Sequence, residues 1–458
     1  MGSLPTLSVL EQSHVSPPPA TTSQSLPLTF FDIVWLALTN PVHSLFFYEL
    51  PIAKPHFTKT IVPSLKHSLS ITLQHFFPFA GKLIIFPTGT RKPEIRYVEG
   101  DSVAVTFAES FLDFKDLTGN HPRECDKFYH LIPLLGRTNK VSDYITIPVF
   151  AVQVTLFPNN GISIGITNHH SLCDASTRFC FLKAWTSIAQ SGNSDGPFLA
   201  NGTFPIYDRL VKYPKLDENY LKKAKVERYN EDYRVPRLSG PTDKVRATFI
   251  LRRIVINGLK QLVSTQLPEL PYVSSFTVAC AYIWNCVANL YGDELALFCM
   301  PVDCRSRMDP PIPGAYFGNC IRPCLSKART SELKDKEGFL TAARLIGENL
   351  HKMLSDKDGI VKYLGPTDSL FRDDWPRRRM AVVGASKLKF YDLDFGFGKP
   401  IKYEALSIDY YGSISISASR ECGEDLEIGV CLSATDMDVF VDNFNSGLES
   451  YIALPKGI

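Results

Sequence analysis

The segment VFAVQVTLFPNNGISIGITNHHSLCDASTRFCFLKAWTSIAQ, residues 149–190, decides the fold class. Residues 149–157 are rich in β-branched and aromatic side chains and predict a strand. The following Pro-Asn-Asn-Gly, residues 158–161, is typical of a tight turn. Isoleucine then alternates with small residues over 162–168, which predicts a second strand ending at His169-His170. The segment therefore begins as a β-hairpin.

A helix is expected directly after the hairpin. From Ser171 onward the apolar residues recur at helical spacing to about Ala189. They are Phe179, Phe181, Leu182, Trp185 and Ile188. A strand that leads straight into a helix indicates an α/β fold.

The same two periodicities recur along the rest of the chain. Helices are predicted over 62–77, 274–290, 339–354 and 437–448. Strands are predicted over 81–86, 94–98, 103–107, 246–253, 295–302 and 426–432, and within 405–416. Residues 1–25 are rich in Ser, Thr and Pro without periodicity, so a mobile or extended lead-in is expected before a first ordered element near Leu26. Strands and helices are interleaved in both halves, which favours the α/β class with mixed sheets.

A polar stretch divides the chain. Residues 191–197 contain Gly, Ser and Asp, and the segment that follows to Asp243 is charged and tyrosine-rich with little periodicity. The length of 458 residues allows two or three domains. We therefore expect an N-terminal domain over 1–190, a crossover linker over 191–243 and a C-terminal domain over 244–458.

Composition excludes several classes of function. Lys+Arg total 49 and Asp+Glu 47, a net charge of +2, so nucleic acid is not an expected partner. The N-terminus lacks a basic region followed by an apolar one, so no secretory signal is expected and the protein should be cytoplasmic. Residues 273–290 are long enough to span a membrane, but four Ser and Asn residues favour a buried helix and no membrane partner.

The eleven cysteines form no recognisable framework. Only Cys320 and Cys324 are close in sequence, and no second pair or histidine is spaced to complete a metal site. Reduced, buried thiols and no metal are therefore expected.

The sharpest local feature is His170-Ser171-Leu172-Cys173-Asp174. A histidine at a strand end, just before a helix, is held by rigid elements and projects into any cleft beyond the sheet, as a general base requires. Two alternatives stay open at this point. Ser171 and Asp174 fit a helix capping box, and His169, His170 and Asp174 could ligate a metal.

Other enzyme signatures are incomplete. The chain has no G-x-S-x-G nucleophile elbow, and Gly81-Lys82 is followed by Leu83, which rules out a phosphate-binding P-loop there. Gly396 and Gly398 form only G-x-G, which is too little for a dinucleotide fingerprint.

Three motifs together resemble the plant BAHD acyltransferase family. They are the His170–Asp174 motif, Tyr316-Phe317-Gly318-Asn319-Cys320 and Asp394-Phe395-Gly396-Phe397-Gly398. Segments 26–32 and 302–307 extend the resemblance over essentially the whole chain, and it is greatest to anthocyanin and flavonoid glucoside malonyltransferases of daisy-family plants. The family usually has tryptophan where Phe397 stands. That change keeps an aromatic filler and loses an indole N–H.

The resemblance implies a fold and a reaction. The fold has two similar-sized domains with mixed β-sheets and flanking helices, as in chloramphenicol acetyltransferase, and an active-site channel between them. In the reaction an acyl group, malonyl by preference, passes from acyl-CoA to a sugar hydroxyl of an anthocyanin or flavonoid glucoside. His170 is the general base, and no covalent acyl-enzyme and no cofactor are needed. A hydroxycinnamoyl donor, or a non-catalytic binding protein of this fold, is the alternative.

Roles for further residues follow from the same resemblance. Asp174 should point away from the channel and pair with Arg305, and Asp394 should be structural. Structural roles are also expected for Tyr316, Phe317, Gly318, Asn319, Gly396, Phe397 and Gly398. Contacts to CoA are expected from Lys260, Ser274, Ser275, Ser386 and Lys387, with ordinary surface residues as the alternative. Thr277 or a backbone N–H is a candidate donor to the oxyanion.

Arg178 is a candidate for recognising the donor. It lies one helical turn after Asp174, so the two can share a face of the helix. A guanidinium there could grip the free carboxylate of a malonyl group, although an ordinary surface arginine is the alternative. Nothing in the sequence requires more than a monomer.

Overall fold

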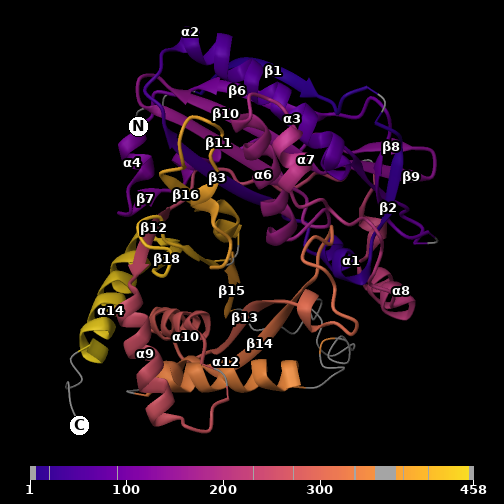
Figure 1. Cartoon of the computed structure of the whole chain (residues 1–458). Helices are drawn as coiled ribbons and strands as arrows, with labels where there is room; N and C mark the ends of the chain where they lie inside the picture. The colour runs from indigo at the N-terminus through magenta and orange to yellow at the C-terminus, as the bar shows by residue number, and fades with distance from the viewer. Residues whose placement is uncertain are drawn as a thin grey trace.

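The computed structural model describes residues 7–19, 21–89, 91–230, 232–271, 273–334, 337–355, 360, 378–384, 386–410 and 412–452. The first six residues of the expected lead-in lie outside this range. Figure 1 shows most of the N-terminal half above and most of the C-terminal half below, each with a sheet and flanking helices. The α/β class with mixed sheets is confirmed.

The predicted hairpin is the centre of the upper sheet. Strands β10 (Phe150–Phe157) and β11 (Gly161–Asn168) are antiparallel, and every residue in them is buried. The sheet has the order β1-β6-β10-β11-β3-β16. Within it β6 (Val103–Glu109) runs parallel to β10, and β3 (Val42–Glu49) is antiparallel to β11. Burial on both faces explains why the hairpin sequence has so few polar residues.

Helices α3 (Val62–His75) and α6 (Ala175–Gln190) pack together beside this sheet. The indole of Trp185 on α6 donates to the hydroxyl of Ser68 on α3 at 3.0 Å, so the buried Trp N–H is satisfied. A smaller antiparallel sheet follows the order β2-β5-β4-β9-β8. Its strands are Gln24–Pro27, Glu94–Tyr97, Lys82–Ile85, Tyr144–Pro148 and Asn139–Val141.

The lower sheet has seven strands in the order β14-β13-β15-β17-β18-β12-β7. In that order they are Ile321–Arg329, Leu295–Asp303, Arg378–Val383, Ile414–Ala418, Leu426–Ser433, Lys244–Leu251 and Arg123–Glu124. The accompanying helices are α9 (Arg253–Gln266), α10 (Ser275–Ala288), α11 (Thr330–Lys334), α12 (Gly338–Ser355) and α14 (Ala434–Ile452). The predicted helices in this half are confirmed to within a few residues. Figure 1 shows α9, α10, α12 and α14 at the end of the molecule away from the upper sheet.

The two halves exchange strands. β7 comes from the N-terminal half and pairs with β12, whereas β16 (Lys402–Ala405) comes from the C-terminal half and pairs with β3. The boundaries 1–190, 191–243 and 244–458 therefore remain a prediction, because these two short strands cross them. The exchange makes the interface between the halves part of both sheets.

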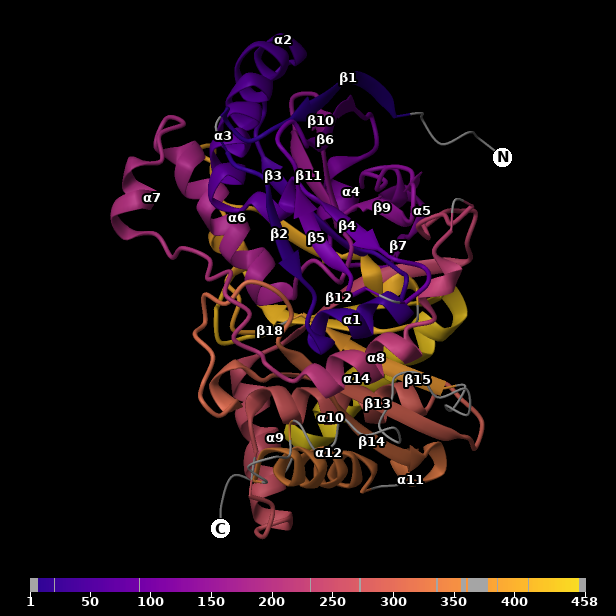
Figure 2. The ribbon, with the colours of Figure 1, turned by 90° about the vertical axis from the view of Figure 1, so that its right-hand side faces the viewer.

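The crossover contains two helices of its own, α7 (Gly196–Asn201) and α8 (Pro214–Lys223). Figures 1 and 2 both place α8 beside α1 (Phe30–Ala37), and the Asp217 carboxylate of α8 accepts a bond of 2.6 Å from the N–H of Phe30. The crossover is thus packed against the N-terminal half.

The prediction that the first ordered element begins near Leu26 is wrong, because residues 8–15 are already ordered. These residues form strand β1 (Ser8–Val15), which pairs antiparallel with β6 at the edge of the upper sheet. An edge strand keeps many side chains in solvent, so its sequence carries little apolar periodicity. α1, β3 and β14 were also not predicted, because short apolar runs do not distinguish helix from strand.

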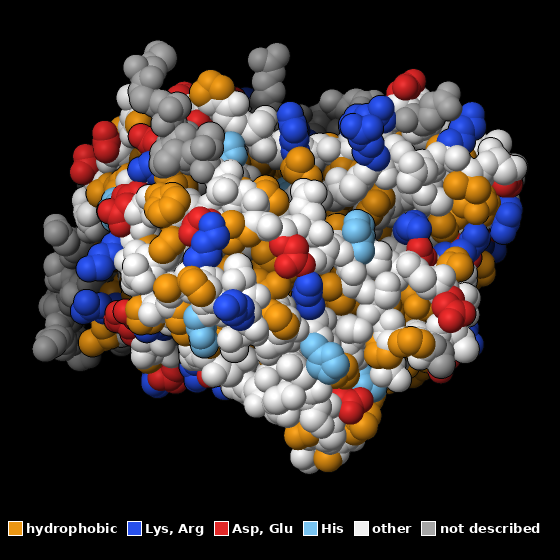
Figure 3. All heavy atoms as spheres, turned by 90° about the horizontal axis from the view of Figure 1, so that it is seen from above, with side chains coloured by type: hydrophobic (Ala, Val, Ile, Leu, Met, Phe, Trp, Pro, Cys, Tyr) orange, Lys and Arg blue, Asp and Glu red, His pale blue; other side chains and the backbone are white. Residues whose placement is uncertain are grey.

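The described helices and surface can be compared with the expectation that neither a membrane nor a nucleic acid is a partner. The segment considered as a membrane span is the buried helix α10, and none of the described helices combines the length and apolar character needed to cross a bilayer. On the face seen in Figure 3, basic and acidic side chains are interspersed, in keeping with the net charge of +2.

Candidate active site

Asp174 is the organising side chain of the site. It is the N-cap of α6, where it accepts the N–H of Thr177 at 3.0 Å, so the helix begins at Ala175. The capping-box alternative is therefore wrong, and the Ser171 hydroxyl is enclosed without a hydrogen-bond partner. The Asp174 carboxylate also pairs with Arg305 at 2.8 Å and accepts the N–H of Cys320 at 3.0 Å. The expected Asp174–Arg305 ion pair is present and buried.

The 316–320 motif wraps around this ion pair. The carbonyl of Gly318 accepts from Arg305 at 3.1 Å and from the Thr177 hydroxyl at 3.0 Å. Gly318 has φ +124°, and a Cβ there would lie 3.2 Å from Arg209 and 3.3 Å from Asp32. The positive φ favours glycine, and a Cβ here would also crowd the Arg209 and Asp32 side chains.

Asn319 links the motif to the backbone of His170. Its side-chain N–H₂ donates to the carbonyl of His170 at 2.9 Å and to Asp32 at 3.0 Å. Asp32, which sequence reasoning did not single out as a site residue, also accepts the Asn319 backbone N–H at 2.8 Å and lies 3.6 Å from Arg209. The other carboxylate oxygen accepts from Thr29 at the start of α1. α1 is thereby fixed against the loop that carries His170.

The His170 ring stacks on Trp35 of α1, with centroids 3.5 Å apart and an interplanar angle of 5°. Its Nδ1 is enclosed without a hydrogen-bond partner, so Nε2 is the candidate nitrogen for contact with a substrate. Burial, together with the charge of Arg178, lowers the pKa of His170 to about 4. The imidazole is therefore neutral at neutral pH, as a general base must be.

His169 belongs to a separate environment. Its Nδ1 accepts the N–H of Ser171 at 3.2 Å, and the residue is 1 % exposed. Among the described residues, His169, His170 and Asp174 do not form a group of metal ligands. The Asp174 carboxylate oxygens are already bound by Arg305 and two backbone N–H groups, so Asp174 is not available as a metal ligand.

Arg178 is buried beside the histidine and is not a surface arginine. One guanidinium N–H₂ donates to the Asn168 side chain at 3.1 Å, and Nε is enclosed without a partner. No carboxylate of the described residues lies within ion-pair distance of Arg178. Its charge contributes to the lowered pKa values of His43 and His170, which places it near both imidazoles.

A cavity lies on the other side of the α6 N-terminus. It is small and partly open to solvent, and it is bounded by helix α6, the crossover and residues 314–316. The lining residues are Phe76, Thr177, Cys180, Thr203, Phe204, Pro205, Gly314, Ala315 and Tyr316. His170 is not among them, so this cavity is separate from the histidine's own surroundings.

The 394–398 motif lies at the far end of α6. Asp394 accepts the N–H groups of Gly396 at 2.7 Å and Gly398 at 3.0 Å, closing a tight loop. Gly396 lies beside Gln190, the last residue of α6. A helix of 16 residues is about 24 Å long, so this loop is remote from His170. Phe397 packs edge-on against Tyr48, with centroids 5.3 Å apart, and stacks on Phe395.

The residues expected to contact CoA are not joined to the His170 cluster by any hydrogen bond or ion pair within the described chain. Ser274 is the N-cap of α10, and its hydroxyl lies 2.8 Å from that of Thr277, with Ser275 exposed next to it. Lys260 is partly buried on α9, and Ser386 and Lys387 lie in the turn after β15. Their roles stay predictions, and Thr277 shares its hydroxyl with Ser274.

Comparison with known proteins identifies the family. The sequence profile of the Transferase family matches residues 6–446. The chain is 54% identical to malonyl-coenzyme A:anthocyanin 3-O-glucoside-6''-O-malonyltransferase of Dahlia pinnata, over 99% of this chain and 100% of that protein. The chain belongs to the BAHD acyltransferase family.

One further sequence relative and one solved structure support this assignment. A malonyl-coenzyme:anthocyanin 5-O-glucoside-6'''-O-malonyltransferase of Salvia splendens is 41% identical, over 97% of this BAHD chain and 96% of that protein. Vinorine synthase matches in structure with a TM-score of 0.68 at 20% identity, over 95% of this chain and 96% of that one. The second match establishes the shared fold, and the family assignment makes the chain an acyl-CoA-dependent acyltransferase.

Proposed function

We propose that this enzyme transfers a malonyl group from malonyl-CoA to a sugar hydroxyl of an anthocyanin or flavonoid glucoside. The names of the Dahlia and Salvia relatives support both the donor and the acceptor class. The observation that carries the choice of donor is Arg178, a buried guanidinium beside His170 with no acidic partner among the described residues.

Burying a cation without an acidic partner destabilises a protein by roughly several kcal/mol, because the charge loses its hydration. An anionic ligand would offset that cost. The free carboxylate of a malonyl thioester has the right charge, and its planar geometry suits a guanidinium, which can donate two parallel hydrogen bonds. Asn168 already holds one corner of the guanidinium, so Arg178 is preorganised to receive the donor.

The chemistry follows from His170. A sugar hydroxyl attacks the thioester carbonyl while Nε2 of His170 takes its proton. The tetrahedral intermediate collapses, the C–S bond breaks, and CoA leaves as its thiol with the proton that His170 returns. No acyl-enzyme forms. The oxyanion donor stays open between Thr277 and a backbone N–H.

Asp174 acts through position and does not touch the reacting atoms. Its pairing with Arg305 and its bonds to Cys320 and Thr177 fix the loop between β11 and α6 that carries His170. We propose the same indirect role for Asn319, which holds the His170 carbonyl. The enzyme is further proposed to work as a cytoplasmic monomer, with no cofactor beyond the CoA thioester.

The test is thiol release from malonyl-CoA, acetyl-CoA and coumaroyl-CoA with an anthocyanidin 3-glucoside as acceptor. Wild type should prefer malonyl-CoA, and H170A should release no thiol above background with any donor. If only coumaroyl-CoA is used, the malonyl assignment is wrong while the acyltransferase chemistry stands. If no donor gives release with several glucosides, the chain is a binding protein of this fold.

A further inference from the structure

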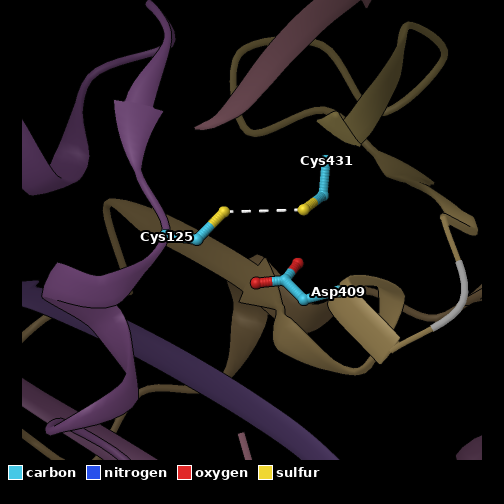
Figure 4. A group of neighbouring side chains, drawn as sticks. All are labelled: Cys125, Asp409 and Cys431. Carbon is cyan, nitrogen blue, oxygen red and sulfur yellow. Dashed lines mark hydrogen bonds between the residues drawn. The ribbon is translucent and has the colours of Figure 1, made fainter. Parts of the chain in front are cut away.

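A second group of polar side chains is buried where the two halves exchange strands. Cys125 follows β7, Cys431 lies in β18, and Asp409 lies in the 3-10 segment Leu406–Tyr410. Figure 4 shows the two sulfur atoms facing each other with the Asp409 carboxylate beside them. Within the described chain, this is the one group of three or more metal-ligand side chains whose ligand atoms lie within 4.8 Å of one another.

The spacing of the sulfurs suits a shared metal ion. Sγ of Cys125 lies 3.5 Å from Sγ of Cys431. Two thiolates bound to one tetrahedral zinc at about 2.3 Å lie roughly 3.8 Å apart, so the pair needs little adjustment. A disulfide would need the sulfurs to approach to about 2.05 Å. Cys125 is 0% exposed and Cys431 and Asp409 are each 3% exposed, so an oxidant has no direct access to the pair.

The Asp409 carboxylate is arranged as a metal ligand with supporting hydrogen bonds. Its Oδ2 accepts from the Tyr129 hydroxyl at 3.1 Å and from Arg246 at 3.3 Å. Its Oδ1 is enclosed and has no hydrogen-bond partner of normal geometry. Ligating carboxylates are commonly held by hydrogen bonds to the oxygen that does not face the metal. An enclosed carboxylate oxygen without a partner of normal geometry, with two thiols beside it, is a place where an ion can bind.

The charge of the surrounding network, which also includes Lys402 at 3.9 Å from Glu404, is compatible with a divalent cation bound by two thiolates. Arg246 pairs with Glu404 at 3.1 Å and with Asp409, and Arg123 pairs with Glu404 at 2.7 Å, all inside the protein. A divalent ion and two thiolates sum to zero charge, so loading would add no net charge to this buried network. Thiolates together with a carboxylate match the ligand preference of zinc.

We propose that Cys125, Cys431 and Asp409 bind a structural zinc ion that ties β7 of the N-terminal half into the C-terminal sheet. Three protein ligands leave one tetrahedral position for water. The ion would enter as the chain folds, with release of the thiol protons. This site is separate from the acyl-transfer chemistry, and it revises the expectation from sequence that the chain binds no metal.

The test measures metal, not activity. Wild-type enzyme and C422S, which changes an exposed cysteine, should each retain about one zinc per chain after dialysis, as a structural site does. The double variant C125S/C431S and the single variant D409N should retain none above background. Cobalt added to metal-free wild type should give a thiolate-to-cobalt absorption band in the near ultraviolet that zinc abolishes.

Several outcomes would overturn the proposal. Wild type that holds no more zinc than C125S/C431S, or a cobalt complex without a thiolate band, would show that no such site exists. Mass spectrometry that finds a Cys125–Cys431 disulfide would assign the pair to redox chemistry. If the variants do not fold, the zinc content and cobalt spectrum of wild type and C422S still decide.

Discussion

The two ends of helix α6 carry two of the motifs that identified the family, and they differ in how their polar atoms are used. At the C-terminal end, Asp394 binds the N–H groups of Gly396 and Gly398, and none of the described side chains of the loop has an enclosed unpartnered polar atom. At the N-terminal end, His170 Nδ1 and Arg178 Nε are enclosed without partners. We call the C-terminal end closed, because its enclosed polar atoms have partners, and such a network stabilises the fold. We call the N-terminal end open, because unpartnered enclosed polar atoms mark where a ligand binds.

The largest effect expected is that of H170A at the open end. Loss of a general base costs about 10²- to 10⁴-fold in rate. The fold should persist, because Nδ1 of the imidazole has no hydrogen-bond partner and the ring is held mainly by stacking on Trp35. The measurement is kcat/KM for malonyl-CoA together with circular dichroism. A variant with native spectrum that keeps more than a tenth of the wild-type rate would remove His170 from the reaction.

D174A should be the most destabilising change at this end of the helix. Breaking one partner of a buried ion pair costs about 3–5 kcal/mol, and here the Arg305 charge would be stranded. D394A removes only two bonds to backbone N–H groups, so about 1–3 kcal/mol is expected at the other end. Urea unfolding of both variants measures the difference. Equal losses would mean that the two ends of α6 do not differ as described.

Arg178 tests whether the open end recognises the donor. R178A should lower kcat/KM for malonyl-CoA by about 10- to 100-fold, the value of a charge-assisted hydrogen bond of about 1.5–3 kcal/mol. Acetyl-CoA, which has no free carboxylate, should be used as well as before. A second variant, N168D, gives the guanidinium an internal carboxylate and should also lower kcat/KM for malonyl-CoA, while acetyl-CoA serves as the control donor for both variants. Equal losses with both donors would assign Arg178 a structural role.

The pH dependence of kcat/KM tests the influence of Arg178 on His170. The pKa of His170 is lowered to about 4, so the base is already deprotonated well below neutral pH and is protonated only as the pH falls through about 4. Wild-type kcat/KM should therefore stay level from pH 8 to about 5, where an ordinary histidine of pKa about 6.5 would have titrated. In R178A the acid limb should move to higher pH, because a neighbouring positive charge is gone. A wild-type limb near 6.5 contradicts the burial of His170.

Local patterns predicted much of the fold and part of the site. The hairpin and α6 were predicted because a period of two followed by a period near 3.6 lies within one segment. Asp32 was not singled out as a site residue, since its bond to Asn319 spans 287 positions. The Cys125–Cys431 contact spans 306 positions and was missed for the same reason. Periodicity reports on neighbours in the chain, so contacts between the halves need the folded structure.

The smallest effect expected is that of F397W, which restores the aromatic residue usual in the family at the closed end. Phe397 is only partly buried and already packs against Tyr48 and Phe395, so an indole adds surface contact without filling a cavity. The change in unfolding free energy should lie within about 0.5 kcal/mol, as for surface substitutions. kcat/KM should not change, because about 24 Å of helix separates the loop from His170. A several-fold change in kcat/KM without a change in stability would show that the closed end communicates with the active site.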